Sequence, residues 1–399
     1  MKRRDFIKFS GTFLGGAAAA GIPSPSTAGT EPAKKIVQYR ELGKTGLKIS
    51  DISFGTGKLN SASLIDRAVG LGINYFDTAP DYGQAEEHIG EYLKSKKGRD
   101  KIILASKLCA HDPYPGHLPL GTAKKDYMEA VEGSLRRMNT DYLDFCFVHA
   151  IGEKKEADYE KEKERLFQEE MLSATEELKK QGKIRFRAVS SHGPHHMEKL
   201  LMDAVKSGHF DLIMPSFNFF EFPGMPGVLE EAKSRGLGVI AMKTLAGGKD
   251  LGITLEGETF EHAAFAWALS QTGVAGLVVT MKNFQQINDY VGASGKKFTK
   301  THQSLLNLYM HRHASVYCRT GCGDCAGACP GGIDIPTVLR HKMYFDDYGE
   351  ELKAMRGYAA LSPQAGACAS CSTPSCDKAC AHGVQVSRLL KTVHARLSL

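Results

Sequence analysis

Four side chains that can donate, accept or orient a proton occur at or just after the ends of short apolar runs in the first half of the chain. Asp77 follows an apolar pair in the segment N-Y-F-D-T-A-P-D-Y-G, and Tyr82 comes five residues later on a loop that a proline and a glycine enforce. Lys107 ends the run I-I-L-A-S-K, and His149 ends the run D-F-C-F-V-H. Each of these residue types alone is common in turns or at strand ends, so the inference depends on their combination. A carboxylate, a phenol, an ammonium and an imidazole together indicate acid–base chemistry.

Eight short apolar runs would form the strands that position these residues. They are Ile52–Thr56, Ile73–Asp77, Ile102–Lys107, Leu143–His149, Ile184–Ser190, Leu212–Phe217, Gly238–Lys243 and Leu277–Thr280. Helical patterns follow the strands, as over Leu64–Leu71, Glu86–Leu93, Met128–Arg137 and Phe260–Leu269. Eight βα units over about 250 residues predict an α/β fold, a closed (β/α)8 TIM barrel. An open doubly wound sheet is the alternative, but no G-x-G-x-x-G follows the first predicted strand.

The strand ends of such a barrel share one mouth, where the four residues are expected to meet. The loop Cys109–Thr122, which follows Lys107 and includes His111, Pro113, Tyr114, Pro115 and His117, is the better candidate for substrate contact. The charge run E-K-K-E-A-D-Y-E-K-E-K-E-R, between His149 and Leu172, is predicted to be a solvated helix face.

These motifs resemble those of the aldo-keto reductase family over the segment from Tyr39 to about Val291. F-D-T-A-P-D-Y-G carries the family's Asp and Tyr, L-A-S-K its Lys, and Y-L-D-F-C-F-V-H its His. The resemblance implies a catalytic tetrad, which comprises Asp77, Tyr82, Lys107 and His149. A free tyrosine has a pKa of about 10, so the phenol needs a nearby cation, which Lys107 would supply. The phenol would protonate the developing alkoxide while the imidazole orients the carbonyl oxygen.

The resemblance also implies a nicotinamide dinucleotide site, for NADP(H) or NAD(H). Its expected residues are Gly55, Thr56, Gly57, Ser190, Ser191, Met242, Lys243 and Lys282. The family commonly shows Gln where this chain has Met214, and a stacking aromatic residue where it has Met242 and Lys243. A polarizable thioether can still cover a ring. The last unit, T-M-K-N-F-Q-Q-I-N-D-Y, lacks the family's usual Arg and leaves Lys282 as its obvious cation, so the choice between the two dinucleotides stays open.

Eight of the ten cysteines fall between Cys318 and Cys380. They form the spacings C-x3-C-x2-C-x3-C-P and C-x2-C-x4-C-x3-C, which resemble the two motifs of ferredoxins that hold two [4Fe-4S] clusters. By analogy, one cluster would bind Cys318, Cys322, Cys325 and Cys380, and the other Cys329, Cys368, Cys371 and Cys376. Two all-cysteine zinc sites and four disulfides are the alternatives.

The N-terminus M-K-R-R-D-F-I-K-F-S-G-T-F-L-G-G-A-A-A-A-G-I-P resembles a twin-arginine export signal. Paired arginines precede a short Gly/Ala-rich run, and Ser26-Thr27-Ala28 offers a small-residue cleavage site. The apolar run is too short to span a membrane, which takes about 20 residues. A periplasmic protein with no stable membrane span is therefore expected.

Length and composition are typical of a globular protein with one large domain and an accessory domain. The chain has 399 residues, of which 42% are hydrophobic. Its formal net charge of +6 includes the basic N-terminus and is too small to indicate nucleic-acid binding. We expect a signal over 1–28, the barrel over 36–295 and a small cysteine-rich, ferredoxin-like domain over 314–399.

The function predicted from these features is that of an exported oxidoreductase that interconverts an alcohol and a carbonyl, either an aldehyde or a ketone, sugars included. Its partners would be this small-molecule substrate and a redox partner protein for the clusters. The alternative is a non-catalytic binding or regulatory subunit of the same fold with structural metal clusters. A complete tetrad favours the enzyme.

Overall fold

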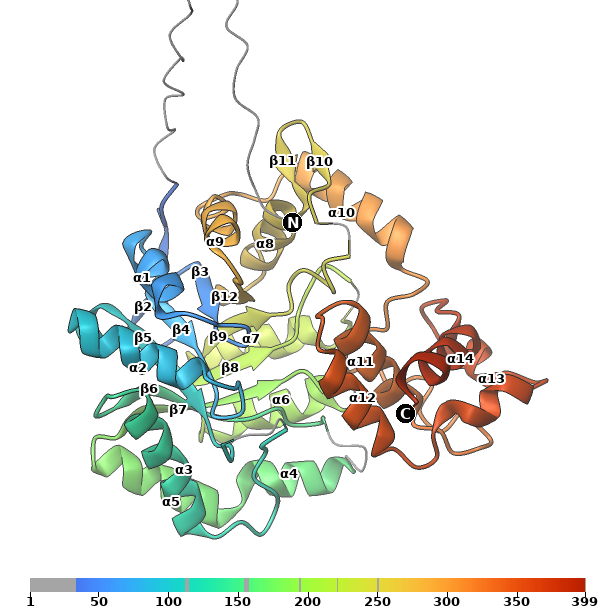
Figure 1. The fold of residues 1–399 in the computed structure, drawn as a ribbon, viewed down its shortest axis with the longest axis horizontal. Coiled ribbons are helices and arrows are strands. Elements are labelled where there is room, and N and C mark those ends of the chain that lie inside the picture. The colour runs from blue at the N-terminus through green and yellow to red at the C-terminus, as the bar shows by residue number, and fades with distance from the viewer. Residues whose placement is uncertain are drawn as a thin grey trace, which may run out of the picture. The chain divides into compact units, whose positions relative to one another are not determined.

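Eight parallel strands close into a barrel in the computed structural model, which describes residues 34–111, 115–153, 158–193, 195–220, 222–249 and 251–398 (Figure 1). The strands are β3 (Ile52–Gly55), β4 (Tyr75–Asp77), β5 (Ile103–Lys107), β6 (Leu143–Val148), β7 (Ile184–Ser191), β8 (Leu212–Pro215), β9 (Gly238–Met242) and β12 (Val274–Thr280). β12 pairs with β3, so that Leu277 lies opposite Ile52 and the ring is complete. The predicted barrel is confirmed, and the open sheet is excluded.

Each strand is buried on both faces because one face fills the barrel and the other packs under helices. In β6, Phe145 and Phe147 belong to the inner cluster with Tyr75 and Met214. Cys146 and Val148, which alternate with them, belong to the cluster between strands and helices. The strands therefore read as near-continuous apolar runs, which is why the sequence revealed them.

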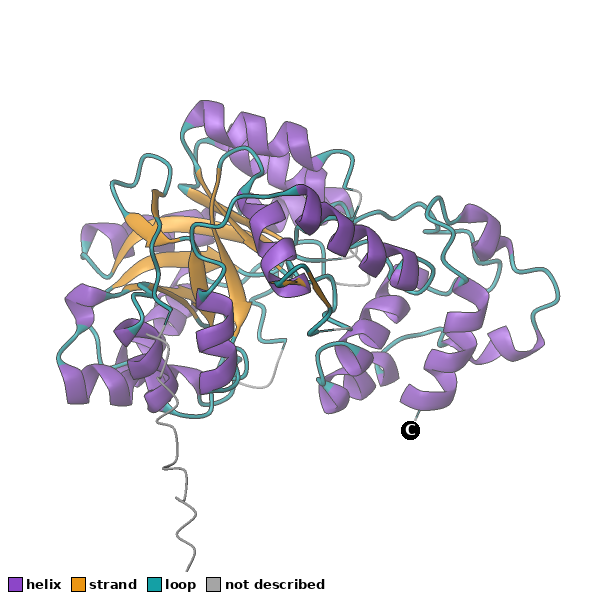
Figure 2. Cartoon of the chain, turned by 90° about the horizontal axis from the view of Figure 1, so that it is seen from above, coloured by secondary structure: helices purple, strands orange, loops and turns teal. Residues whose placement is uncertain are grey.

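Helices surround the strands, as Figures 1 and 2 show. They are α1 (Ala62–Gly70), α2 (Ala85–Lys96), α3 (Lys124–Arg137), α4 (Tyr159–Phe167), α5 (Glu169–Lys180), α6 (Met197–Ser207), α7 (Met225–Arg235), α8 (Phe260–Leu269) and α9 (Phe284–Val291). Shorter elements are the hairpins β1 (Tyr39–Glu41) with β2 (Lys48–Ser50) and β10 (Thr254–Leu255) with β11 (Glu258–Thr259), and the 3-10 turn η1 (Arg99–Lys101). The four predicted helices are present as α1, α2, α3 and α8.

A helical segment follows the barrel. Helix α10 (Lys300–His313) packs on α8, where the rings of Tyr309 and Phe260 stack with centroids 4.1 Å apart. The remaining elements are α11 (Ile335–Asp346), α12 (Glu351–Ala359), η2 (Ala365–Ser370), α13 (Ser375–Ala379) and α14 (Val386–Leu397). Their apolar side chains, among them Val338, Tyr358 and Leu390, form a second hydrophobic cluster that includes Cys325, Cys368 and Cys376.

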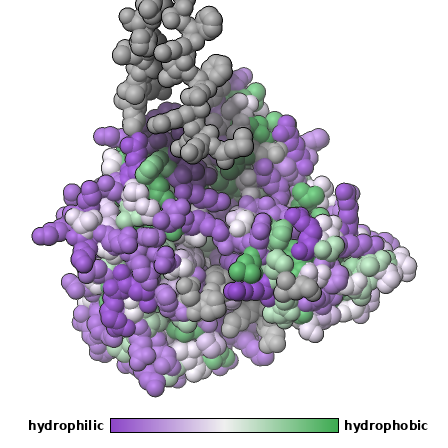
Figure 3. Space-filling model, viewed as in Figure 1, coloured by the Kyte–Doolittle hydropathy of each residue, from purple (hydrophilic) through white to green (hydrophobic). Residues whose placement is uncertain are grey.

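Residues 34–399 form one compact unit by their contacts. Figure 3 shows a face on which hydrophilic side chains predominate and hydrophobic ones are scattered. Over the described residues, no helix combines the length and the apolar character needed to cross a bilayer. The predicted signal, over 1–28, lies outside the described residues.

Candidate active site

The structure brings the four predicted catalytic residues together at one end of the barrel. Asp77 ends β4, Lys107 ends β5 and His149 directly follows β6, and all three are buried. The Lys107 ammonium donates to Asp77 Oδ2 at 2.7 Å and to the Thr78 carbonyl at 2.6 Å. It also lies 4.9 Å from the centre of the Tyr82 ring, which lies 6.1 Å from the His149 ring, centre to centre. Lys107 therefore links the carboxylate to the phenol.

Burial sets the protonation of this group. Burial, then the Asp77 carboxylate, raises the pKa of the Tyr82 phenol well above 10. We expected Lys107 to lower the pKa of the Tyr82 phenol. The pKa is instead raised, because desolvation and nearby carboxylates outweigh the ammonium. Burial, then His117, lowers the pKa of His149 well below 6.5. At neutral pH the phenol is a protonated donor and the imidazole is neutral.

Two side chains of α4, which the sequence did not connect to the site, fix the loop after β6. Arg165 of α4 donates to the His149 carbonyl at 3.4 Å, and Glu162 accepts from the Gly152 amide at 2.7 Å. Both side chains are buried, so the prediction of a solvated face for this charge run is wrong at these two positions. Glu162 and Arg165 are three residues apart, which places them on the same face of α4. Because both are charged and stand in a run of charged residues, the sequence does not show that this face is buried.

The predicted cofactor residues Ser190 and Ser191 hydrogen-bond the same loop, and they are not among the residues that line the large cavity beside Tyr82. Ser190 Oγ accepts from the Ala150 amide at 3.1 Å, and Ser191 Oγ donates to the Ile151 carbonyl at 2.9 Å. Both are fully buried. Among the described residues, their hydroxyls therefore serve the backbone of the site.

A cavity of about 490 Å³ opens beside the four residues. Its lining includes Asp77 and Tyr82 together with most of the predicted cofactor residues, namely Gly55, Thr56, Gly57, Met242, Lys243 and Lys282, and also Met214. This size suits a ligand site. Gly55 allows close packing here, because a Cβ would lie 3.0 Å from Val278 and 3.4 Å from the Thr280 amide. The lining, which brings the predicted cofactor residues to Tyr82, therefore fits a nicotinamide dinucleotide.

The C-terminal segment supplies another part of this lining, which the sequence did not indicate. Tyr344, Asp347, Tyr348, Glu350 and Lys353 all face the cavity. These five residues are called the C-terminal wall below. Because nothing in their local spacing marks such a long-range contact, no sequence signal was available for them.

Ionic and aromatic contacts attach the C-terminal wall to the barrel loops. The Lys243 ammonium lies 4.8 Å from the centre of the Tyr348 ring. Lys58 Nζ lies 2.9 Å from Glu350 Oε1, and Lys249 pairs with Asp347. Burial, then Arg340 and Lys353, lowers the pKa of Lys243 well below 10.5. An anion bound in the cavity would raise the pKa of Lys243 again.

Glu153 joins several of these groups and was also missed. Its carboxylate accepts from the Tyr344 hydroxyl at 2.6 Å and lies 3.4 Å from both His117 and His192. Although burial raises the pKa of Glu153, the two histidines and other cations outweigh it, so the pKa lies well below 4.5. Glu153 is therefore an anion beside the tetrad.

The eight clustered cysteines fall into two groups in space. Burial raises the pKa of the Cys318 thiol to about 12, and the thiols that raise it further are Cys325, Cys322 and Cys380. For Cys368, burial is again the largest cause, and the neighbouring thiols are Cys329, Cys376 and Cys371. The ferredoxin analogy assigns the same neighbours to Cys318 and to Cys368, and the crossed ligand sets stay a prediction.

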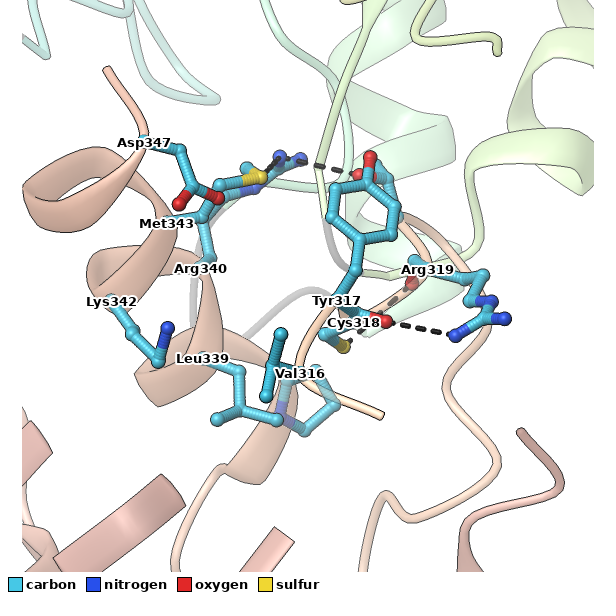
Figure 4. Close-up of a pocket in the computed structure, with 11 residues that line it drawn as sticks. Val316, Tyr317, Cys318, Arg319, Leu339, Arg340, Lys342, Met343 and Asp347 are labelled. Carbon is cyan, nitrogen blue, oxygen red and sulfur yellow. Dashed lines mark hydrogen bonds between the residues drawn. The ribbon is translucent and has the colours of Figure 1, made fainter. Parts of the chain in front are cut away.

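All ten cysteines are described, and the structure joins none of them in a disulfide. Thiols gathered in fours raise one another's pKa, so a metal centre that binds thiolates would relieve their repulsion. Each group therefore offers four neighbouring thiols to such a centre. Cys318 borders a small cavity whose other side is formed by Arg340, Met343 and Asp347 (Figure 4).

The chain is similar in sequence to a known protein family and to proteins of known activity. The model described as "Aldo/keto reductase family" matches residues 51–252. The L-glyceraldehyde 3-phosphate reductase of Escherichia coli K12 is 29% identical over 238 residues, 55% of this chain and 65% of that protein. The L-galactose dehydrogenase of Arabidopsis thaliana is 30% identical over 226 residues, 53% of this chain and 66% of that protein. The chain thus spans just under two thirds of either relative.

A solved structure shows the same fold. The aldo-keto reductase of Bacillus halodurans, in its holo form, superposes with a TM-score of 0.53 at 24% identity. The match covers 68% of this chain and 96% of that protein.

Proposed function

The chain belongs to the Aldo/keto reductase family, and on this premise we propose that it is an oxidoreductase that interconverts a carbonyl and an alcohol. The observation that carries the proposal is the position of Lys107, 2.7 Å from Asp77 and 4.9 Å from the Tyr82 ring, at the end of a cavity of ligand size. That arrangement places a proton donor beside an ammonium whose charge stabilises a phenolate.

Each residue of the tetrad has a separate role in carbonyl reduction. Tyr82 gives its proton to the carbonyl oxygen, and Lys107, held by Asp77, stabilises the phenolate that remains. Neutral His149 orients the oxygen with its ring N–H. A nicotinamide dinucleotide, NADP(H) or NAD(H), would supply or accept the hydride when bound against Met214, Met242 and Lys243. The barrel walls exclude water from the reacting atoms.

The substrate class follows from the polar mouth. His192 and the polar and charged side chains of the C-terminal wall, which line the cavity, suit a hydroxylated aldehyde, ketone or sugar better than an apolar carbonyl. The names of the two relatives above, which refer to a sugar and a sugar phosphate, support this class. Whether the protein reduces a carbonyl or oxidises an alcohol depends on which substrate is supplied.

A turnover assay tests the proposal. Purified protein is given a panel of small aldehydes and sugars with NADPH or NADH, and nicotinamide absorbance is followed. Lys107→Met should remove turnover, because the phenolate loses its cation. Tight dinucleotide binding with no turnover of any substrate would instead favour the binding or regulatory subunit.

Two further proposals concern the rest of the chain. The two groups of four thiols would hold two [4Fe-4S] clusters, which exchange single electrons with a redox partner protein. Nicotinamide transfers two electrons as hydride, so the clusters are not placed in the carbonyl reaction itself. The motif of paired arginines supports export of the folded protein to the periplasm.

Export is tested by replacing Arg3 and Arg4 with lysine. The variant should remain in the cytoplasm, because the translocase reads the arginine pair. A periplasmic variant would reject the twin-arginine route.

A further inference from the structure

Cys109, on the loop after β5, contacts the ring of His149. Its Sγ lies 2.9 Å from His149 Nδ1, and both side chains are buried. The loop is held in place by a backbone bridge between Cys109 and His117, and the His117 ring packs edge-on against His149 with centroids 4.6 Å apart. The thiol therefore meets the imidazole from a fixed backbone.

The direction of this hydrogen bond decides which ring nitrogen carries the proton. A thiol sulfur is a weak acceptor, whereas an unprotonated imidazole nitrogen is a good one. Burial, then Asp81, raises the pKa of the Cys109 thiol well above 9, so the S–H group is retained. With S–H donating to Nδ1, the proton of the neutral ring lies on Nε2.

Two charged groups near His149, Asp81 and Arg165, do not hydrogen-bond its Nδ1. Among the described residues, the titratable groups recorded near the ring or its backbone include Asp81, Tyr82, Lys107, His117, Arg165, His192 and Lys353. Asp81 Oδ2 is 3.9 Å from Nδ1, too far for a hydrogen bond, and instead accepts from the Gly116 amide at 2.9 Å. Arg165 hydrogen-bonds the backbone carbonyl of His149 and not its ring.

We propose that Cys109 is a positioning residue that fixes the Nε2–H tautomer of His149, the form that donates a hydrogen bond to the carbonyl oxygen. Its consequence for turnover rests on the proposed function, whereas the tautomer itself does not. Cys109 itself keeps its S–H bond during the reaction and is neither oxidised nor reduced. Without this donor, the proton is free to shift to Nδ1, next to Asp81, and the ring then presents a lone pair to the substrate oxygen.

The first test measures the tautomer directly. Protein labelled with nitrogen-15 in histidine is studied by NMR, and the His149 signals are assigned with His149→Gln. We expect a protonated Nε2 and an unprotonated, hydrogen-bonded Nδ1 in the wild type. Cys109→Ala should give a mixture of both tautomers. An Nδ1–H tautomer in the wild type, or an unchanged tautomer in Cys109→Ala, would overturn the proposal, whether or not a substrate has been found.

The second test measures turnover. Cys109→Ala should lower kcat by a factor on the order of 10 or more, the size seen when a group that orients a metal-bound histidine is lost. Cys109→Ser, which keeps a donor at this position, should recover most of it. Dinucleotide affinity should not change in either variant, since Cys109 does not line the cavity.

Cys146→Ala is the matched control, because Cys146 is an equally buried thiol that packs toward the helices outside the barrel. Its turnover should equal that of the wild type. Equal losses in the Cys109→Ala and Cys146→Ala variants, or a Ser variant no better than Ala, would reject a positioning role and leave packing as the explanation.

Discussion

The Tyr344 hydroxyl donates a 2.6 Å hydrogen bond to the Glu153 carboxylate, and so attaches the last helices of the chain to the barrel loop that follows His149. A hydrogen bond to a buried charged group contributes about 1.5–3 kcal/mol. The C-terminal wall is therefore held against the cavity by more than surface contacts.

This attachment predicts slow release of the dinucleotide. The wild-type protein should retain nucleotide through purification, and Tyr344→Phe should release it about tenfold faster, as expected for a loss of about 1.4 kcal/mol. Release is measured by chasing bound NADPH with excess NADP⁺ in a stopped-flow fluorimeter. Tyr358→Phe, which removes a hydroxyl that contacts His394 away from the cavity, is the control. Identical release from Tyr344→Phe and the wild type would show that the wall does not control exchange.

For the proton donor, Tyr82→Phe should reduce carbonyl turnover by a factor on the order of 100 or more. Dinucleotide affinity should stay nearly the same, because the ring remains and only the hydroxyl is lost. Steady-state kinetics and equilibrium fluorescence titration check the two halves of this statement. Full activity of the variant would assign the proton to another group.

Dinucleotide preference should depend on Lys282, an exposed cation at the edge of the cavity. Lys282→Gln should weaken NADPH several-fold and leave NADH unchanged, since only NADPH has a phosphate for the ammonium to contact. Dissociation constants at two salt concentrations measure the effect, which should shrink at high salt. Lys297→Gln, at an exposed site away from the cavity, is the control. Equal weakening of both dinucleotides would mean that Lys282 does not read the phosphate.

The cluster proposal predicts about eight iron and eight labile sulfide per chain in protein purified without air. Double variants then test the grouping. Cys322→Ala with Cys380→Ala should remove one centre and leave about half of the iron, because both thiols belong to one group. Cys371→Ala with Cys380→Ala should remove both. Two zinc ions per chain, or equal iron loss in the two double variants, would contradict the crossed arrangement.

His341 of α11 should make stability depend on pH. Burial lowers its pKa from 6.5 to about 4, so the unfolded chain takes up a proton that the folded one refuses between these values. Its contribution is present above pH 6.5 and is lost as the pH falls toward 4. His341→Gln should therefore lose less stability than the wild type between pH 7 and about 4.5 in urea unfolding, by at most about 3 kcal/mol. His311→Gln, at an exposed position of α10, is the control. Parallel pH profiles for His341→Gln and the wild type would refute this account.

The sequence predicted the elements whose signal is local. Strands such as β6 could be located because both of their faces are buried, and the residues Asp77, Lys107 and His149 lie within or beside such runs. The grouping of the cysteines was implied by the resemblance to ferredoxins and stays a prediction. Contacts between distant segments carry no such signal, so the roles of Cys109, Glu153 and the C-terminal wall became visible only in the fold. The hydrogen bonds from Ser190 and Ser191 to the loop after β6 were likewise not visible in the sequence.

The position of the C-terminal wall also has a consequence for the order of events during protein synthesis. The barrel strands end at Thr280, but the cavity is bordered by residues as late as Lys353. A ribosome-bound chain whose barrel has already emerged still lacks one side of its ligand site. Loading of a dinucleotide should thus follow completion of nearly the whole polypeptide, and a chain cut short after the barrel would fold around an open site that holds its ligand poorly.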